Sequence, residues 1–371
     1  SLSIDKEKNS AIHVDNMAKL TINDSVGNGK IESKKDYGIY ALNGGKVIVN
    51  NGIIESKFAA LTGNNTTGDM NFEVHGGTLT ATDGPAIYMP GQVELTMTNG
   101  ILNGGISLRM GQVNISGGTI NAITSGIDEP KDYYHFSGNA WMPDALYVFG
   151  GTYTSKNSTY GNSLKLNITG GTFNCENDKG SAVAIYDFGK VSQPMNVSIS
   201  GSAELNTKAS VRNAYDVLSL KDIGVDNPKE GFNNNDYVGK VSTSIIGGMF
   251  SKDPSKYVTN GYTVTESNGK FVVSRISTGG GAVVPPATDN VTNNPADKNT
   301  TADLAPAVKD NKAETTVDAK TADKIVDKAV ENKSTEVVID AAGNNNVASS
   351  EVAIPEKTVK ELAEKTDANL V

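Results

Sequence analysis

The stretch Val113-Asn114-Ile115-Ser116-Gly117-Gly118-Thr119-Ile120 decides the fold, because the same unit returns throughout residues 1–275 of this 371-residue chain. Each unit is an alternating stretch, then Gly-Gly or Asn-Gly, then Thr or another residue that favours extended structure. Further copies lie at 46–54, 71–79, 93–102, 166–173 and 243–250, with a degenerate copy at 197–205. Internal repetition of this kind indicates a repeat architecture.

The spacing of the units predicts the coils of a solenoid. The second glycines of four successive units are 25, 23 and 18 residues apart, at Gly52, Gly77, Gly100 and Gly118. Such an interval matches one coil of a solenoid and is too short for a propeller blade. A second strand type, exemplified by Ala182-Val183-Ala184-Ile185-Tyr186, alternates with the first.

Each unit places its apolar side chains on one face. Leu166 and Ile168 precede Gly170 by four and two residues, and a period of two turns both to the same side of a strand. The intervening Asn167 is then expected to face water. The glycine pair permits a sharp bend between strands, because φ can be positive there.

One coil cannot bury its apolar face alone, whereas stacked coils can. We therefore predict an all-β fold, a single-stranded parallel β-helix over 1–275. A sandwich of hairpins is the alternative, because hairpin turns also use Gly and Asn. The solenoid is preferred since the unit returns in register, and the general chirality of parallel β crossovers makes it right-handed.

The Gly-Gly-Thr repeats, with Ala-Ile-Tyr strands between them, resemble those of right-handed parallel β-helix ectodomains of large cell-surface proteins from gut Firmicutes. These proteins share the pectate-lyase-like (pectin lyase-like) superfold. The stretch 248–258, followed by 261–264 and 271–273, resembles their terminating hairpin, expected near 257–274. The resemblance implies an adhesin-like, extracellular protein that is attached to the cell wall through regions outside this sequence.

The composition changes after residue 275. Of the 39 glycines, 35 lie in 1–275, and Phe271 is the last aromatic residue. Residues 276–306 contain a Gly run, Pro285-Pro286 and many polar residues, so we predict a disordered linker. Beyond it, the patterns predict a helix near 322–330, a strand at 336–340 and a second helix at 356–363.

These elements make 307–371 a partial α/β module. It resembles a segment that often precedes S-layer-homology anchoring repeats in Firmicute surface proteins, and those repeats do not occur here. The expectation is therefore a truncated module in a fragment of a longer, wall-attached protein. The alternative is a small autonomous α/β cap.

Composition excludes several classes of protein. No run of 18 apolar residues exists, so no transmembrane segment is expected. A net charge of −9 with only three arginines argues against nucleic-acid binding. The single Cys175 rules out an intramolecular disulfide and a multi-cysteine zinc site. Its place after a Gly-Gly-Thr-Phe unit predicts a small buried thiol.

Two insertions between coils are candidate ligand-binding loops, since function on solenoids tends to reside in grown loops. Residues 124–143 hold several rings, and 208–240 mixes both charges and is expected to be partly helical near 215–220. Ring faces can stack on sugars. The candidate ligand-binding residues are Tyr133, Tyr134, His135, Trp141, Arg212 and Tyr215. The alternatives are a loop that seals one flank of the solenoid and a solvated crossover.

Catalytic chemistry is weakly signalled. A polysaccharide lyase needs a strong base and a cation for its uronate substrate, but the arginines are limited to Arg109, Arg212 and Arg275. Glycoside hydrolysis needs two carboxylates about 5–9 Å apart. The pectin-hydrolase pattern of Asn-Thr-Asp, Asp-Asp, Gly-His-Gly and Arg-Ile-Lys is missing from this sequence. His75 is expected to be an outward-facing polar residue. The oxygen-rich 233–236 could hold Ca²⁺ but lacks the spacing of a dedicated loop.

The sequence therefore favours a non-catalytic extracellular adhesion module that presents an extended β-helix face to a glycan, with no catalytic residue assigned. The expected partner is a polysaccharide or a host or bacterial surface glycan, and the chain is expected to be a monomer. Apart from Ca²⁺, no cofactor or metal is expected. The first rival is a polysaccharide lyase or glycoside hydrolase of the same superfold, and the second is a passive stalk.

Overall fold

The structure is a computed structural model of the 371-residue chain, which divides into two compact units, Ser1–Ile276 and Ser277–Val371. The division falls one residue beyond the predicted end of the solenoid. The structure describes all residues except 8–9, 64–69, 124–140, 151–152, 156–157, 161–162, 188–194, 220–221, 223–240, 277–289, 295–297, 305–306, 310–311, 318, 341–348 and 371.

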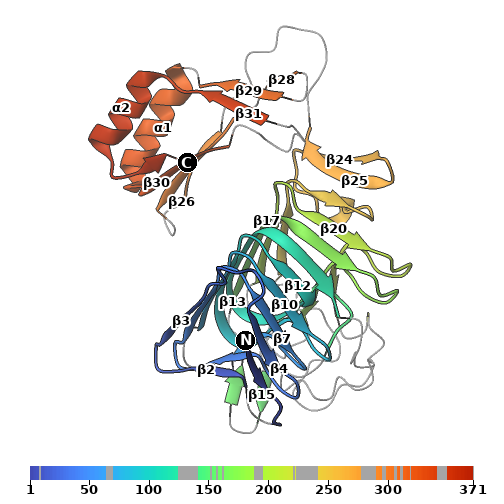
Figure 1. The fold of residues 1–371 in the computed structure, drawn as a ribbon. Helices are drawn as coiled ribbons and strands as arrows, with labels where there is room; N and C mark the ends of the chain where they lie inside the picture. Colours follow the sequence, from blue (N-terminus) through green and yellow to red (C-terminus); the bar gives the residue numbers. More distant parts are fainter. Residues whose placement is uncertain are drawn as a thin grey trace. The chain divides into compact units, whose positions relative to one another are not determined.

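The first unit is a parallel β-helix, as predicted (Figure 1). Its strands form three sheets, and each strand pairs in parallel with the equivalent strand of the next coil. Sheet 1 contains β1 (Leu2–Ile4), β4 (Lys30–Ser33), β7 (Ile53–Ser56), β10 (Thr78–Ala81), β12 (Ile101–Gly104), the ends of β13 (Ile106–Ala122) and β17 (Leu164–Cys175), β20 (Glu204–Thr207) and β23 (Met249–Phe250).

The other two sheets complete each coil. Sheet 2 contains β2 (Ile12–Val14), β5 (Ile39–Ala41), β8 (Leu61–Gly63), the starts of β11 (Ile87–Met97) and β13, β14 (Leu146–Gly150), β18 (Val183–Asp187) and β21 (Tyr215–Leu218). Sheet 3 contains β3 (Lys19–Ile22), β6 (Lys46–Val49), β9 (Met70–Val74), the end of β11, the middle of β13, the start of β17, β19 (Met195–Ile199) and β22 (Val241–Ile245).

The repeated unit spans the corner between sheets 3 and 1. Its alternating stretch lies in sheet 3, where Leu166 and Ile168 pair with Val113 and Ile115 of the preceding copy. All four side chains are at most 1% exposed, so the predicted inward face is confirmed. The intervening Asn167 is half-exposed and donates to Asn114, also half-exposed, over 2.8 Å.

The two positions at this corner require glycine for different reasons. The second has a positive φ, for example 85° at Gly77 and 92° at Gly118, as the bend requires. The first lies outside that region but packs against the backbone of the preceding coil. A Cβ on Gly76 would lie 2.4 Å from the carbonyl oxygen of Asn50, and one on Gly117 would lie 2.2 Å from that of Thr98. Close stacking of coils therefore selects the first glycine.

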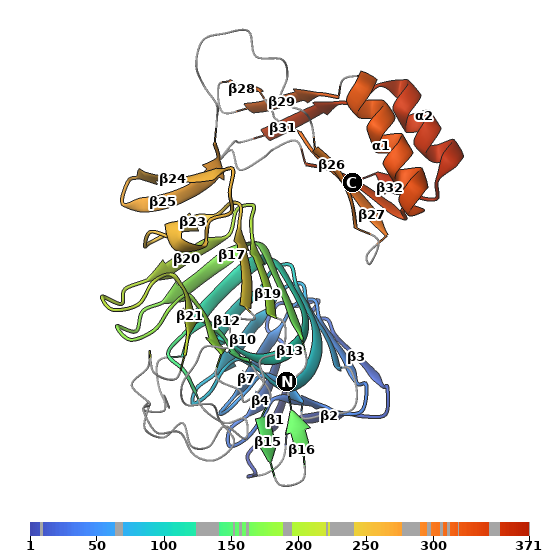
Figure 2. The same cartoon turned by 180° about the vertical axis from the view of Figure 1, so that it is seen from behind.

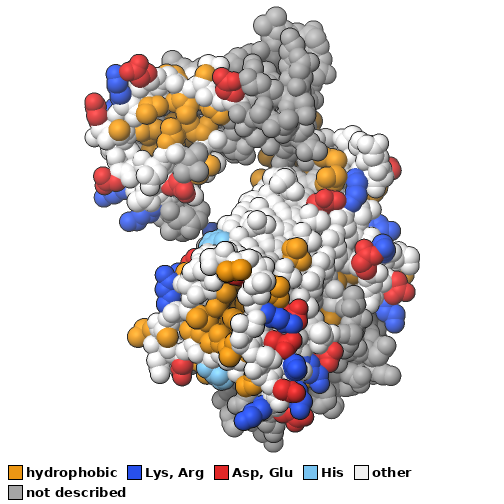
Figure 3. Space-filling model, in the orientation of Figure 1, with side chains coloured by type: hydrophobic (Ala, Val, Ile, Leu, Met, Phe, Trp, Pro, Cys, Tyr) orange, Lys and Arg blue, Asp and Glu red, His pale blue; other side chains and the backbone are white. Residues whose placement is uncertain are grey.

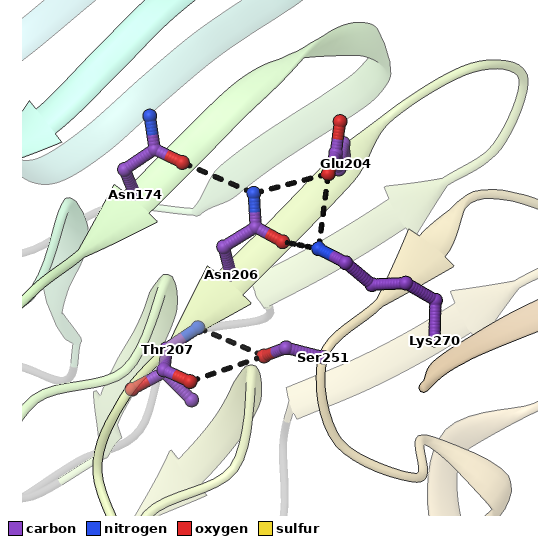
Figure 4. A network of polar contacts seen from close by, with 6 residues as sticks. All are labelled: Asn174, Glu204, Asn206, Thr207, Ser251 and Lys270. Carbon is purple, nitrogen blue, oxygen red and sulfur yellow. Dashed lines mark hydrogen bonds and ion pairs between the residues drawn. The ribbon is translucent and has the colours of Figure 1, made fainter. Parts of the chain in front are cut away.

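An antiparallel hairpin ends the solenoid where the resemblance places it. After η3 (Ser255–Tyr257), β24 (Tyr262–Ser267) pairs with β25 (Lys270–Arg275), and β25 also pairs antiparallel with β23. The Lys270 amine contacts Glu204 over 3.0 Å and the side-chain oxygen of Asn206 (Figure 4). Beside it, Ser251 links to the backbone of Thr207. The hairpin thus covers an edge that would otherwise offer unpaired backbone groups.

The opposite end of the solenoid is more apolar. Figure 3 shows apolar side chains gathered over the end that holds the first strands. Leu2, Met17 and Val26 are 46%, 82% and 78% exposed. Leu20 and Ile22 of β3 are only partly buried against the core. The first coil therefore packs against a neighbouring coil on one side only.

The second unit contains the helices α1 (Ala319–Asn332) and α2 (Glu356–Lys365), which are seen in Figure 2. It has its own hydrophobic core, which includes Ile325, Val337 and Leu362. The elements of this unit are β26 (Asn290–Asn294), β27 (Asn299–Asp303), β28 (Ala307–Lys309), β29 (Lys312–Thr316), α1 (Ala319–Asn332), β30 (Glu336–Asp340), β31 (Ser349–Ala353), α2 (Glu356–Lys365) and β32 (Asn369–Leu370). A strand–helix–strand element occurs twice, first as β29, α1 and β30 and then as β31, α2 and β32. The two copies lie side by side in the sheets, because β29 pairs in parallel with β31 and β30 pairs in parallel with β32.

The prediction of a disordered linker over 276–306 does not hold for its second half. β26 and β27 form an antiparallel pair, and β27 continues the sheet through β30. Val291 and Ala302 are buried in the second core at 8% and 0% exposure. Their Asn- and Thr-rich neighbours lower the mean hydropathy, which hid two strands that bury only one face each.

Candidate functional site

The long connections of the solenoid begin or end at sheet 2. Between sheets 3 and 1, by contrast, the turns are short and built on glycine. Residues 123–145 lead from β13 to β14, residues 188–194 from β18 to β19, and residues 219–240 from β21 to β22. A short antiparallel pair, β15 (Tyr153–Ser155) and β16 (Ser158–Tyr160), lies between β14 and β17. The borders of sheet 2 are therefore where loops could form a site.

A groove of about 420 Å³ opens at the border of sheets 1 and 2. It is lined by Thr80, Ala81, Thr82, Asn103, Gly104, Asn121, Ala122 and Ile123. These residues come from the ends of β10, β12 and β13, whose parallel register brings Thr80, Asn103 and Asn121 into one row. The insertion at 124–143 follows directly from Ile123, so the groove lies at its base.

Side chains along the groove form a ladder of hydrogen bonds. Asn103 Nδ2 donates to Thr80 Oγ1 over 3.2 Å, and Asn121 Nδ2 donates to Asn103 Oδ1 over 2.9 Å. The ladder continues from Asn174 to Asn121 and from Asn206 to Asn174, both over 3.0 Å. An amide has two donor hydrogens and two acceptor lone pairs, and at Asn103 and Asn121, the rungs that line the groove, these bonds use one of each.

The ladder was not found from the sequence, although the repeat contains its signal. Asn103, Asn121 and Asn174 each stand three residues after the second glycine of their unit, which is Gly100, Gly118 and Gly171 respectively. The fold turns this recurrence into one row, because equivalent residues of successive parallel coils lie about 4.8 Å apart.

The groove has no titratable lining residue among those that the structure describes. Its polar groups are the hydroxyls of Thr80 and Thr82 and the amides of Asn103 and Asn121. Such groups donate and accept hydrogen bonds but do not serve as general acids or bases at neutral pH. This chemistry suits the recognition of a hydroxyl-rich ligand.

Trp141 forms a wall of this region and is not an exposed platform. Its side chain is 9% exposed and meets the Tyr88 ring edge-on, with the ring centroids 5.1 Å apart. Ala59 and Ile123 complete this buried cluster, and Ile123 also lines the groove. Trp141 is therefore a candidate ligand contact whose ring is buried by the apolar contacts of sheet 2.

The other predicted site residues are dispersed. Arg212 donates to the carbonyl of Lys179 and to the hydroxyl of Tyr186, both over 3.2 Å, so it braces the border of sheet 2. Tyr215 is 2% exposed in the solenoid core, and its hydroxyl lies 2.7 Å from Thr243 Oγ1. Tyr133, Tyr134 and His135 lie outside the described residues, so their role stays a prediction.

The helix expected near 215–220 is wrong. Tyr215–Leu218 forms β21, which pairs in parallel with β18. Tyr215 turns its ring into the core, and Asp216 lies on the other face of the strand. Parallel pairing with the coil before it outweighs any local helical preference of this stretch.

A buried polar network supports the same border. Asp144 is fully buried and accepts hydrogen bonds from the Ser181 backbone N–H, over 2.7 Å, and from the Tyr186 hydroxyl, over 2.6 Å. Burial raises the pKa of Asp144 to about 6, although the positive charge of Arg212 opposes the shift. Asp216 accepts from Ser181 Oγ over 2.8 Å. Full burial gives Asp144 a structural role.

The single cysteine is a buried thiol, as predicted. Cys175 is 1% exposed, and its sulfur lies 3.1 Å from the carbonyl oxygen of Pro143. Burial raises its pKa to about 12, which keeps the sulfur in the unreactive thiol form. His75 lies at the sheet 3 to sheet 1 corner, within 2.9 Å of Thr98 Oγ1 and 3.2 Å of Glu73 Oε2.

Among the described residues, no three His, Cys, Asp or Glu side chains gather as a metal site would require. The candidate calcium segment 233–236 lies outside that part of the chain. Where the structure describes helices, none has the length and apolar character needed to cross a bilayer.

The chain matches no known protein family, no curated protein and no solved structure. The fold defines the class, a protein built on a parallel β-helix.

Proposed function

We propose that this chain is a non-catalytic, extracellular adhesion module whose solenoid binds a polysaccharide in the groove between sheets 1 and 2. The observation that supports it is the described lining of the groove, which consists of hydroxyls, amides and small apolar residues with no titratable group. The surface location rests on the resemblance to Firmicute cell-surface proteins.

The geometry fits an extended, hydroxyl-rich polymer better than a compact ligand. Amide rungs recur coil by coil along the solenoid, as Asn103 and Asn121 do on the floor of the groove. A polysaccharide offers hydroxyls at a repeating interval, and each hydroxyl can both donate to and accept from an amide. Polar groups placed at intervals in a partly apolar cleft are typical of ligand recognition.

The rival functions make different demands. A lyase of this superfold would need a base and a cation at the bound uronate, and a glycoside hydrolase would need two carboxylates beside the bond that breaks. The described lining of the groove contains neither a basic side chain nor a carboxylate. A passive stalk would bind no glycan on any face, which makes it the outcome to test directly.

The test compares two asparagine pairs of the same solenoid. Asn103→Ala with Asn121→Ala removes the amides of the groove, whereas Asn114→Ala with Asn167→Ala removes a bonded pair from sheet 3. Glycan-array screening identifies a binding polysaccharide, and calorimetry then measures its affinity for each protein. We expect the groove variant to lose about tenfold or more in affinity and the sheet 3 variant to keep it.

Three outcomes would overturn the proposal. Equal loss in both variants would place the binding elsewhere, and absence of binding across the array would favour a stalk. Formation of unsaturated uronate products, followed by ultraviolet absorbance, or of new reducing ends would establish an enzyme. Thermal unfolding of each variant checks that the solenoid is intact.

A further inference from the structure

Four ring side chains form a strip on the outer side of the first coils of sheet 2. We name His13, Tyr40, Tyr37 and Phe58 the ring strip. Successive ring centroids are 5.6 Å apart from His13 to Tyr40, 5.7 Å from Tyr40 to Tyr37 and 6.0 Å from Tyr37 to Phe58. His13 is exposed and the other three are half-buried. The strip therefore combines fixed packing with accessible ring surface.

Stacking of the coils explains why these rings meet. β2 and β5 pair in register, which places His13 opposite Tyr40 on the outward face. Tyr37 and Phe58 occupy the turns that enter sheet 2 in successive coils. No spacing motif in the sequence links the four, because 27, 3 and 21 residues separate neighbours along the strip (40 − 13, 40 − 37 and 58 − 37).

The ring strip leads to the groove. Next to Phe58, the Lys57 carbonyl accepts from the Asp83 N–H over 2.7 Å and from Thr82 Oγ1 over 3.4 Å, and Thr82 lines the groove. Tyr37 also packs against the buried cluster of Trp141 and Ile123. The strip and the groove are thus neighbouring parts of one surface along the border of sheets 1 and 2.

A charged pair lies beside Phe58 on this surface. The Lys57 amine lies 5.1 Å from the Phe58 ring centroid and 3.9 Å from an Asp83 oxygen. The positive charge at the strip thus has a carboxylate beside it. A uronate-rich polymer would need a cation without such a partner, whereas a neutral sugar needs only C–H contact with ring faces and hydrogen bonds.

We infer that the ring strip is the stacking platform for a neutral polysaccharide whose chain continues into the groove. The inference rests on the proposed function and adds the ligand class. Tyr40 and Phe58 contact the apolar faces of pyranose rings, while Asn103 and Asn121 bond to hydroxyls further along the chain. The ligand runs along the solenoid axis, because the ring strip and the groove each span successive coils.

The test uses hexasaccharides of known charge. Cellohexaose and mannohexaose are the neutral probes and hexagalacturonate is the charged probe, each titrated by calorimetry into the whole chain. We expect at least one neutral probe to bind and hexagalacturonate to bind about tenfold more weakly or not at all. Tyr40→Ala and Phe58→Ala should each weaken neutral binding about tenfold.

The matched control is Tyr262→Ala, which removes a half-buried tyrosine from the terminal hairpin, away from the strip. Phe58→Leu keeps apolar volume without the ring, so it tests stacking even if Phe58→Ala is poorly folded. Emission of the single Trp141 reports that each variant is folded.

The outcomes separate this inference from the proposed function. Unchanged affinity in Tyr40→Ala and Phe58→Leu, with loss in the Asn103→Ala and Asn121→Ala double variant, would overturn the ring strip and keep the groove. Preference for hexagalacturonate, or no binding of either neutral probe, would overturn the neutral ligand class. Unchanged affinity in the groove variant would overturn the proposed function itself.

Discussion

At the scale of the residue, Gly76 and Gly261 separate two reasons for which this chain uses glycine. Gly76 has no positive φ, but a Cβ there would lie 2.4 Å from a backbone oxygen of the neighbouring coil. Gly261 has a φ of 91° and nothing within 4 Å of a Cβ. Gly76→Ala therefore tests coil stacking alone, and Gly261→Ala tests backbone conformation alone.

We expect Gly76→Ala to lower the free energy of unfolding by about 2 kcal/mol or more, because a backbone oxygen cannot move aside without separating two coils. Gly261→Ala should cost about 1 kcal/mol, which is the typical penalty for a left-handed residue with a Cβ. Urea unfolding followed by Trp141 emission measures both in the solenoid. A neutral Gly76→Ala would contradict the steric explanation.

At the scale of the element, the terminal hairpin is joined to the amide ladder by one side chain. Lys270 of β25 contacts Glu204 and Asn206 of β20 (Figure 4). The Lys270 and Glu204 side chains are 32% and 31% exposed. Because solvent screens such a pair only in part, its contribution should exceed that of a fully exposed pair.

We expect Lys270→Met to cost about 1 kcal/mol and to speed hydrogen exchange in β24 and β25. The control is Lys208→Met, which removes the pair between Lys208 and Glu176, whose side chains are 69% and 64% exposed. It should change stability by a few tenths of a kcal/mol at most. Equal effects of the two substitutions would show that the ladder does not hold the hairpin.

At the scale of the whole molecule, burial of Asp144 makes stability depend on pH. Its pKa is about 6 in the fold and near 3.8 in an unfolded chain, so the folded state binds the proton more tightly. This contribution is fully present below pH 3.8 and is lost as pH rises through 6. The two pKa values limit it to about 3 kcal/mol.

Comparison with Asp144→Asn isolates this effect. We expect the unfolding free energy of the parent protein, relative to Asp144→Asn, to fall as pH rises from 4 to 7. Carboxylates with lowered pKa, such as Glu73 beside Lys46, destabilise the fold at low pH but are present in both proteins and cancel. Parallel pH profiles for the two proteins would contradict the assignment.

The prediction from sequence succeeded where local pattern and global packing agree. The period of two, the glycine pairs and the coil length predict the stacked coils of a parallel β-helix, because each coil imposes the same constraint on the next. The linker prediction failed at β26 and β27, where Val291 and Ala302 are buried among polar neighbours such as Thr300. Trp141 and Tyr215 were grouped as candidate ligand contacts, but ring hydrophobicity alone does not distinguish an exposed platform from a core residue.

The sequence by itself determined the solenoid, since glycine conformation and alternating burial act over a few residues. Tertiary structure alone decided the groove and the ring strip. Asn121 and Asn174 meet although 53 residues separate them, and His13 meets Tyr40 across 27. Which outward residues meet depends on strand register across connections of unequal length. A local pattern places a residue on a face, but only the stacked coils determine its neighbour on that face.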